Sequence, residues 1–213
     1  MPNSGNTRPT PRARVLAAII ALCAFAALAV QTTLGDGSIL QNLGAMLRYF
    51  TIWSNVAACL VMAWIALGGQ PPRAVMAALT TAITVVGVVY WGLLAATHDP
   101  VGLDRITNQF HHTFVPLATV AWWLAFTPPN PRVWSVVPAI MVPPLAYGAF
   151  AFVHGELTGF YAYFFLDLPA QGAAGFIIAN IVLALFFALV GAGLVSGKNA
   201  LARRRGITAS LHP

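Results

Sequence analysis

The chain has 213 residues, of which 59% are apolar and only 8% are charged. So few charged side chains cannot cover the surface of a water-soluble globule of this length, and the composition predicts a protein whose solvent is lipid. The net charge of +6 would suit a nucleic-acid-binding surface in a soluble domain. Here the basic residues flank apolar runs, where membrane topology and anionic lipid head groups account for them, so no nucleic-acid partner is expected.

Six apolar runs follow one another, and each is long enough to cross a hydrocarbon layer of ~30 Å as a helix. They are Val15 to Leu34, Leu43 to Leu67, Ala74 to Ala96, Ile106 to Phe126, Val133 to Val153 and Gly175 to Val195. The sequence therefore predicts an all-α, polytopic integral membrane protein with six transmembrane helices. We expect a mobile cytoplasmic tail over residues 1–11, a membrane domain over residues 12–197, and a basic cytoplasmic tail over residues 198–213.

The charged residues predict which side of the membrane each loop faces. All five acidic residues lie in alternate gaps between the runs: Asp36, Asp99, Asp104, Glu156 and Asp167. The other gaps and the two tails carry nine of the eleven Lys and Arg residues, all except Arg48 and Arg105. By the positive-inside bias, both termini are predicted to be cytoplasmic, and the plasma membrane is the expected location.

Two runs carry features that compete with a plain spanning helix. Arg12 and Arg14 before the first run, with small residues at its end, also fit a signal peptide. Six spans already satisfy the charge pattern, so we expect this run to be retained. The fifth run contains Pro138, Pro143 and Pro144, and because proline removes a backbone donor and clashes with the preceding turn, we expect a kinked or broken helix.

Polar side chains in the second and fourth runs mark candidate functional positions, because they are costly inside a membrane unless partners or water satisfy them. In the second run, Thr51 and Asn55 are four residues apart and share a helical face. The fourth run enters from the outer side with Asp104, Asn108, His111 and His112. Thr51 and His112 each lie about five residues, or ~7 Å, from their helix starts, so the two side chains are expected to meet.

A threonine and a histidine at one depth form a candidate nucleophile and base. A Thr hydroxyl needs an adjacent base, and a neutral imidazole can take its proton and return it to a leaving group. Asp104 or Asn108 is expected to orient the ring. Donors that could stabilise an oxyanion are Asn55, Asn108 and a tyrosine of the outer loop between the last two runs, Tyr161 or Tyr163.

Other interpretations of these residues stay open. An intramembrane Thr commonly bonds a carbonyl of its own helix, and intramembrane histidines commonly make plain interhelical hydrogen bonds. A metal site is a further alternative, because ligand types gather on the outer side: His98, His111, His112, His154, Asp104, Glu156 and Asp167. Their spacing matches no standard metal motif, so neither a metal nor another cofactor is predicted.

Three segments together resemble, in this order, the bacterial branch of the androgen-induced membrane protein family. They are Phe50-Thr-Ile-Trp-Ser-Asn55, His111-His-Thr-Phe-Val-Pro116 and Leu157-Thr-Gly-Phe-Tyr-Ala-Tyr-Phe-Phe-Leu-Asp167. The third segment is the most specific, and the resemblance spans nearly all six runs. It implies a six-transmembrane fold and, by analogy with the animal members, serine-hydrolase-like cleavage of fatty acid esters of hydroxy fatty acids.

Carried onto this sequence, the resemblance makes Thr51 the nucleophile. His112 is the chosen base because it directly precedes Thr113 and stands four residues before Pro116, and His111 is its substitute. The expected function is hydrolysis of a lipid ester near the outer leaflet, with membrane lipid as partner. The alternatives are a small solute or lipid binding or transport protein without hydrolytic chemistry, a metal-dependent membrane hydrolase, and a structural membrane protein.

Overall fold

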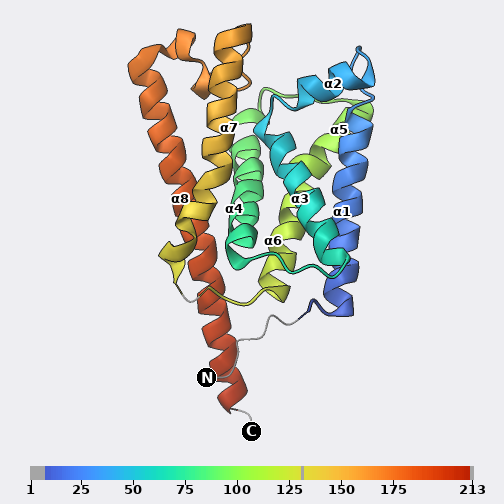
Figure 1. The fold of residues 1–213 in the computed structure, drawn as a ribbon, viewed down its shortest axis with the longest axis vertical. Coiled ribbons are helices and arrows are strands. Elements are labelled where there is room, and N and C mark those ends of the chain that lie inside the picture. The colour runs from blue at the N-terminus through green and yellow to red at the C-terminus, as the bar shows by residue number, and fades with distance from the viewer. Residues whose placement is uncertain (1–7, 131, 212–213) are drawn as a thin grey trace. The chain divides into compact units, whose positions relative to one another are not determined.

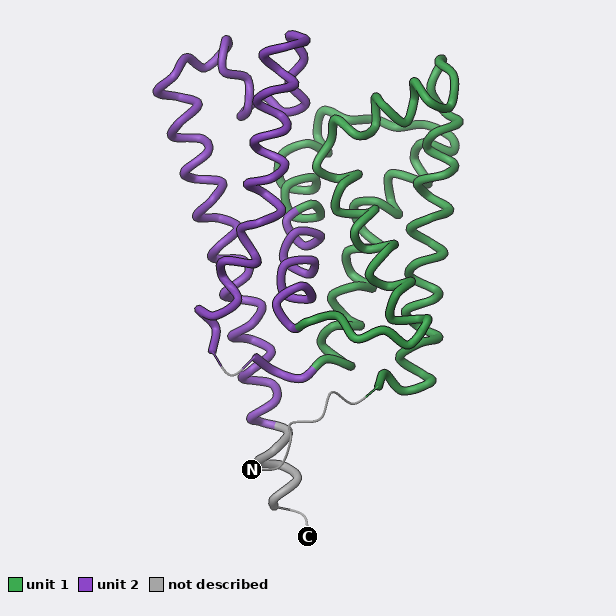
Figure 2. The backbone as a smooth tube through the Cα atoms, in the orientation of Figure 1, with its two compact units in different colours: residues 1–72, 86–127 green, residues 73–85, 128–213 purple. Residues whose placement is uncertain are grey.

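The computed structural model describes residues 8–130 and 132–211, with side chains up to Arg204. Every regular element in those residues is a helix, as the sequence predicts (Figure 1). The chain divides into two units, residues 1–72 with 86–127 and residues 73–85 with 128–213 (Figure 2). One helix, α4 (Arg73–Val89), contributes residues to both units.

Among the described residues, four helices are long and apolar enough to cross a membrane. They are α1 (Pro11–Gln31), the helix Arg73–Leu94 formed by α4 and η1 (Tyr90–Leu94), the helix Val133–Thr158 formed by η3 (Val133–Val136) and α7 (Val137–Thr158), and residues Leu168–Arg204 of α8 (Leu168–Leu211). The number becomes five if α2 (Ile39–Met46) and α3 (Phe50–Ala66), which are bent by 103°, count as one span. Several helices therefore have the length and composition of membrane spans.

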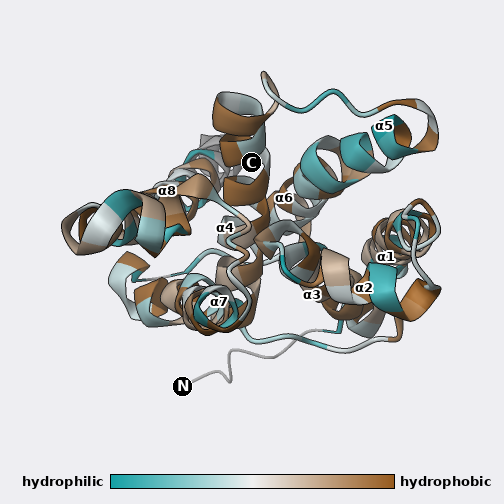
Figure 3. Ribbon diagram, turned by 90° about the horizontal axis from the view of Figure 1, so that it is seen from above, coloured by the Kyte–Doolittle hydropathy of each residue, from teal (hydrophilic) through white to brown (hydrophobic). Residues whose placement is uncertain are grey.

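Two of the predicted runs look different in the structure. The run from Leu43 to Leu67 is not one straight helix, because the chain turns between α2 and α3. The run from Ile106 to Phe126 belongs to a continuous helical stretch made of α5 (Gly102–Gln109), η2 (Phe110–Phe114) and α6 (Val115–Phe126). It is not among the helices that qualify as spans, and its first part, α5, is largely hydrophilic (Figure 3).

In the first unit, α1 packs along α3 and also touches α5, η2 and α6. Its buried face carries small residues, among them Ala13, Ala17 and Ala24, so the neighbouring helix can approach closely. Two polar contacts hold the N-terminal end of α1, one from α6 and one to α3. Trp122 Nε1 donates to the Ala13 carbonyl at 2.8 Å, and Arg14 Nε donates to the carbonyl of Ala66, the last residue of α3, at 2.9 Å.

In the second unit, α7 packs against α8, and residues 73–85 of α4 join them. Gly191 of α8 lies so close to its neighbours that an added Cβ would be 2.7 Å from Ile140 Cδ1 and 2.9 Å from Thr81 Oγ1. The proline-rich helix is not broken, because α7 runs on through Pro143 and Pro144, and the alternative expectation of a kink stays a prediction. Pro138 lies in its first turn, where no intrahelical donor is lost.

The predicted tail boundaries are only partly within the described residues, because residues 1–7, 212 and 213 lie outside them. At the N-terminal side, α1 begins at Pro11, and the Thr10 side chain caps it by accepting from Ala13 N at 3.2 Å. At the C-terminal side, α8 continues past residue 198 to Leu211. Helix α8 therefore extends through the predicted start of the basic tail.

Candidate functional site

Thr51 lies at the start of a helix in the first unit. Tyr49, which is extended with φ −108° and ψ 134°, precedes α3, so Thr51 is the second residue of that helix. The Leu47 carbonyl lies four residues before Thr51 and accepts from the indole N–H of Trp53 at 2.8 Å. Among the described residues, no hydrogen bond joins the Thr51 hydroxyl to a carbonyl of the preceding turn.

Threonines inside the long helices have different hydrogen bonds. Thr80, Thr81 and Thr84 of α4 each donate to the carbonyl four residues earlier, at 2.7, 2.8 and 2.7 Å. The Thr51 hydroxyl lies instead 3.4 Å from Nε2 of His112. This is longer than an ordinary O–H···N contact of about 2.8 Å, and such lengthening is common in catalytic sites without substrate. The Thr51 hydroxyl therefore contacts the imidazole of His112 rather than a carbonyl of its own helix.

The imidazole of His112 has its hydrogen-bonding pattern set by the backbone. Nδ1 lies 3.1 Å from the carbonyl oxygen of Asn108. A carbonyl only accepts, so in the neutral ring Nδ1 carries the proton and Nε2 carries the free lone pair. The lone pair then faces the Thr51 hydroxyl, which donates to it. Thr51 and His112 have the arrangement of a nucleophile and its general base.

Both candidate histidines belong to the π-helix η2, and π-helical turns occur frequently at functional sites. His112 faces Thr51, whereas His111 is only 3% exposed and neither of its ring nitrogens has a hydrogen-bond partner among the described residues. Of the two residues that the sequence left as candidate bases, His112 is therefore the one in contact with the hydroxyl.

Asn55 is completely buried and uses both of its amide hydrogens within the site. Its Nδ2 donates to the carbonyl of Thr51 at 2.9 Å and to the carbonyl of His111 at 3.2 Å. The oxyanion role expected for Asn55 does not fit this geometry, because no N–H remains for a substrate oxygen. Instead, the side chain ties the first turn of α3 to η2.

Asp104 and Asn108 have different roles in the structure. Asp104 Oδ1 accepts from Gln31 Nε2 at 2.9 Å, and Thr107 also bonds to Gln31, so this polar group joins α5 to the end of α1. The backbone of Asn108, not Asp104, bonds to the His112 ring. Asn108 Nδ2 donates to the hydroxyl of Tyr90 at 2.7 Å.

Tyr90 is a site residue that the sequence analysis missed. Its ring stacks on the imidazole of His112 with centroids 3.8 Å apart and planes inclined by 18°. The only sequence signal is an aromatic residue near the outer end of an apolar run, which is also typical of membrane-interface anchors.

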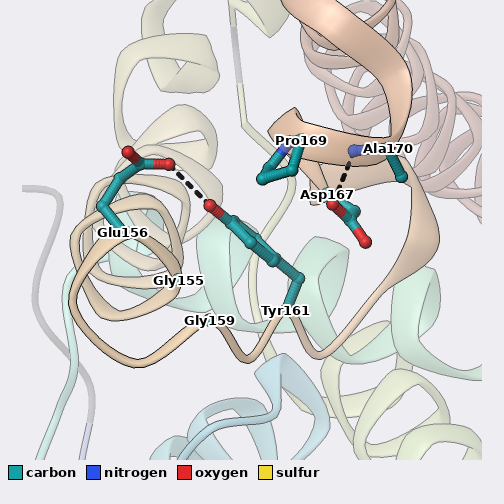
Figure 4. A pocket seen from close by; sticks show the side chains of 7 residues that line it. All are labelled: Gly155, Glu156, Gly159, Tyr161, Asp167, Pro169 and Ala170. Carbon is teal, nitrogen blue, oxygen red and sulfur yellow. Dashed lines mark hydrogen bonds between the residues drawn. The ribbon is translucent and has the colours of Figure 1, made fainter.

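Tyr161 and Tyr163 lie in the second unit, in the loop between α7 and α8. The Tyr161 hydroxyl donates to Glu156 Oε1 at 2.6 Å across an open pocket of about 550 Å³ (Figure 4). This hydrogen bond, with smaller effects of partial burial and of the charges on Glu156 and Asp167, raises the pKa of Tyr161 to about 12. The Tyr163 ring stacks on Phe165 with centroids 5.1 Å apart. These contacts belong to the second unit alone, and the oxyanion role stays a prediction.

An apolar pocket of about 210 Å³ adjoins η2 on its α1 side. It is lined by Ile19, Ile20, Cys23, Phe110, Phe114, Val115 and Ala118. Phe110 and Phe114 begin and end the same π-helix that carries His112. A hydrocarbon chain is the ligand that such a lining suits, because it offers no polar partner.

The metal alternative depends on whether the outer-side ligand residues come together. In residues 8–130 and 132–211, no three His, Cys, Asp or Glu side chains lie close enough to share a metal ion. His98, His112 and His154 instead contact oxygen atoms and aromatic rings, as His98 and His112 do with Tyr90. Comparison with known proteins finds no matching protein-family model, curated protein or solved structure.

Proposed function

We propose that this chain is a multi-pass plasma-membrane hydrolase that cleaves a lipid ester with Thr51 as nucleophile and His112 as general base. One observation carries the proposal: the Thr51 hydroxyl lies 3.4 Å from the imidazole nitrogen whose lone pair is made available by the Asn108 contact. An aligned hydroxyl and base is the arrangement that acyl transfer requires.

The proposed reaction has two steps. The Thr51 oxygen attacks the ester carbonyl carbon while its proton passes to His112 Nε2, and collapse of the tetrahedral intermediate breaks the bond to the alcohol, which takes that proton. The product on the protein is an acyl-threonine ester. Water then gives a proton to Nε2 and attacks the acyl carbon, which releases the fatty acid and returns the proton to Thr51.

The start of α3 supplies a favourable field for the negative charge of these intermediates. The positive end of the helix dipole lies at the first turn of α3, where the N–H groups of Ile52 and Trp53 already bond to the Tyr49 carbonyl at 3.0 and 3.4 Å. Because Thr51 is the second residue of α3, an oxyanion formed beside its hydroxyl would lie near this end. In this proposal the field of the helix dipole takes the role expected of Asn55, whose amide hydrogens bond to backbone carbonyls.

A lipid substrate agrees with the surroundings of the site. The pocket beside η2 is lined only by apolar residues, and large apolar side chains of α1 such as Ile19 and Leu22 are exposed, by 51% and 66%. An acyl chain entering from a bilayer would meet such surfaces without losing hydrogen bonds.

The proposed topology has six spans with both termini in the cytoplasm. In this topology α2 and α3 together count as one span, and the helical stretch Gly102–Phe126 counts as another. The polar side chains of α5 have partners that support this placement, because Asp104 and Thr107 both bond to Gln31 of α1. The distribution of Lys and Arg over alternate gaps supports the orientation.

The test is covalent labelling of the purified protein with a fluorophosphonate probe, which reacts with activated hydroxyl groups. We expect wild type to be labelled, Thr51→Ala and His112→Ala to lose labelling, and Thr51→Ser to keep it. A matched control is Thr158→Ala, because Thr158 also contacts a histidine, at 3.2 Å from His154 Nδ1, but its hydroxyl lies 2.7 Å from the His154 carbonyl, which can only accept.

Two results would contradict the proposal. Labelling that persists in Thr51→Ala would assign the reactive group elsewhere. A well-folded wild type that is not labelled, in detergent and in lipid alike, and that releases no fatty acid from ester lipids would favour a binding or transport protein without hydrolytic chemistry.

A further inference from the structure

Tyr90 contacts the proposed base over the full face of its ring. Tyr90 is the first residue of the π-helix η1, and its side chain is 4% exposed. The stacking distance of 3.8 Å between ring centroids and the near-parallel planes mean that the tyrosine covers one face of the imidazole. Such a contact restricts rotation of the imidazole about its bond to Cβ.

Asn108 holds both rings of this stack. Its backbone carbonyl accepts from His112 Nδ1 at 3.1 Å, and its side-chain amide donates to the Tyr90 hydroxyl at 2.7 Å. The hydroxyl oxygen therefore acts as an acceptor toward Asn108, and its own proton is free for His98 Nδ1, 3.3 Å away. The plane of the tyrosine ring is thus fixed at its far end by two hydrogen bonds.

A glycine one turn before Tyr90 permits the close approach. A Cβ added to Gly87 would lie 3.1 Å from the carbonyl oxygen of His112, which is tighter than ordinary packing contacts. The backbone of α4 can therefore come close to η2 at this point. Tyr90, three residues further along the same helix, then reaches the imidazole face.

We infer that Tyr90 is a positioning residue that holds the His112 imidazole in the plane in which Nε2 meets Thr51. The inference rests on the proposed function for its catalytic meaning. The contact to the Asn108 carbonyl fixes one atom of the ring, but the ring can still swing about that atom. Stacking removes this freedom, so the lone pair of Nε2 stays aimed at the hydroxyl. Holding a base in reactive alignment contributes to rate without any contact with substrate.

The experiment compares Tyr90→Phe with Tyr90→Leu. Phenylalanine keeps the stacked ring and loses the hydroxyl, whereas leucine loses the ring face. We expect the fluorophosphonate labelling rate of Tyr90→Phe to stay within about threefold of wild type and that of Tyr90→Leu to fall by about 10²-fold. The control is Tyr147→Leu, because Tyr147 is also 4% exposed but lies in the second unit, and its loss should leave the labelling rate of folded protein unchanged.

A second readout does not depend on activity. The ¹⁵N resonances of the His112 imidazole, assigned by their absence in His112→Gln, report which ring nitrogen carries the proton. We expect a single tautomer protonated at Nδ1 in wild type and in Tyr90→Phe, and an averaged signal in Tyr90→Leu.

The two readouts separate failure of this inference from failure of the proposed function. If Tyr90→Leu keeps both the labelling rate and the imidazole signals of wild type while Thr51→Ala loses labelling, Tyr90 has no positioning role and the hydrolase proposal stands. If wild type is not labelled, the hydrolase proposal fails. The imidazole signals of Tyr90→Leu then still decide whether Tyr90 holds the ring.

Discussion

The different surroundings of His111 and His112 give each of these neighbouring residues a distinct chemistry. His112 has one nitrogen on a backbone carbonyl and the other near a hydroxyl, so its imidazole can accept a proton at a defined atom. His111 is as deeply buried as the apolar core but has no hydrogen-bond partner at either nitrogen among the described residues. A buried polar group without partners destabilises the folded state.

Exchanging each histidine for leucine should therefore affect fluorophosphonate labelling differently. We expect His111→Leu to keep fluorophosphonate labelling and to raise the free energy of unfolding by about 1 kcal/mol, because a costly unpartnered polar ring is replaced by an apolar side chain. His112→Leu should lose labelling. Thermal unfolding compares the stability of the two variants with that of wild type, and fluorophosphonate labelling compares the reactivity of their Thr51 hydroxyl groups. Loss of labelling in His111→Leu with a normal melting temperature would show that the wrong histidine was chosen.

Tyr161 offers a pH-dependent observable far from these histidines in the sequence. Its hydroxyl donates to Glu156, and the pKa of Tyr161 is raised to about 12 from an ordinary value of about 10. The hydrogen bond needs the protonated phenol, so its contribution to stability is fully present below pH ~10 and is lost as the pH rises through about 12. Glu156→Gln should lower the pKa of Tyr161.

The measurement is an ultraviolet titration of tyrosinate absorbance, with Tyr161→Phe subtracted to isolate one of the five tyrosines. An equal midpoint in wild type and Glu156→Gln would mean that the carboxylate does not hold the phenol proton.

At the scale of elements, two π-helices bring the site together. η1 carries Tyr90 and ends the helix that begins with α4, whereas η2 carries His111 and His112 and lies between α5 and α6. A π-helical turn contains more residues than an α-helical turn, so each segment rotates the side chains that follow it away from the positions that α-helical spacing predicts. The direction in which η2 and α6 present their side chains therefore depends on where along this helical stretch the wider turn occurs.

Gly87→Ala tests the close approach of α4 to η2. The added methyl group would lie 3.1 Å from the His112 carbonyl, so the backbones must move apart by a few tenths of an ångström. Alanine favours helix over glycine by about 1 kcal/mol, which offsets the crowding in the unfolding free energy. We therefore expect little change in melting temperature but labelling that is slower by about tenfold, because the imidazole is displaced.

Gly148→Ala provides the control, because nothing lies within 4 Å of a Cβ at that position of α7. It should stabilise the protein without affecting labelling. If both glycine variants label at the rate of wild type, the separation between α4 and η2 does not control the site.

At the scale of the whole molecule, the number and direction of the spans decide where a substrate can reach Thr51. In the part of the chain that the structure describes, four helices qualify as spans by length and composition, or five with α2 and α3 taken together. The stretch Gly102–Phe126, which carries the proposed base, is not one of them. In the proposed six-span topology this stretch crosses the membrane, and its polar first part lies near the outer surface.

Reporter fusions test this topology. Alkaline phosphatase, which is active only outside the cytoplasm, should be active when fused after Asp36, Asp99 or Gly159 and inactive when fused after Gly69, Pro129 or Pro213. If Gly102–Phe126 does not cross, the fusion after Pro129 will be active like the fusion after Asp99. That result would refute six spans and leave the Thr51–His112 contact itself unaffected.

Much of the site could be predicted from residue type and depth, but its hydrogen bonds could not. Thr51 and His112 were expected to meet because both lie near the outer ends of helices that run in the same direction. Asp104 was an equally good candidate to orient the ring, and Asn55 to bind an oxyanion. The structure instead gives the first role to the Asn108 backbone and commits the Asn55 amide to two carbonyls.

The sequence by itself determined that the chain is helical and that several of its helices have membrane composition, because hydropathy and run length are local properties of neighbouring residues. It also identified the polar residues that such a composition must accommodate. Only the tertiary structure decided that His112 rather than His111 meets Thr51, and that Tyr90 stacks on its ring. These contacts depend on helix rotation, which the π-helical turns and the close approach at Gly87 set, and no periodicity of a single segment encodes it.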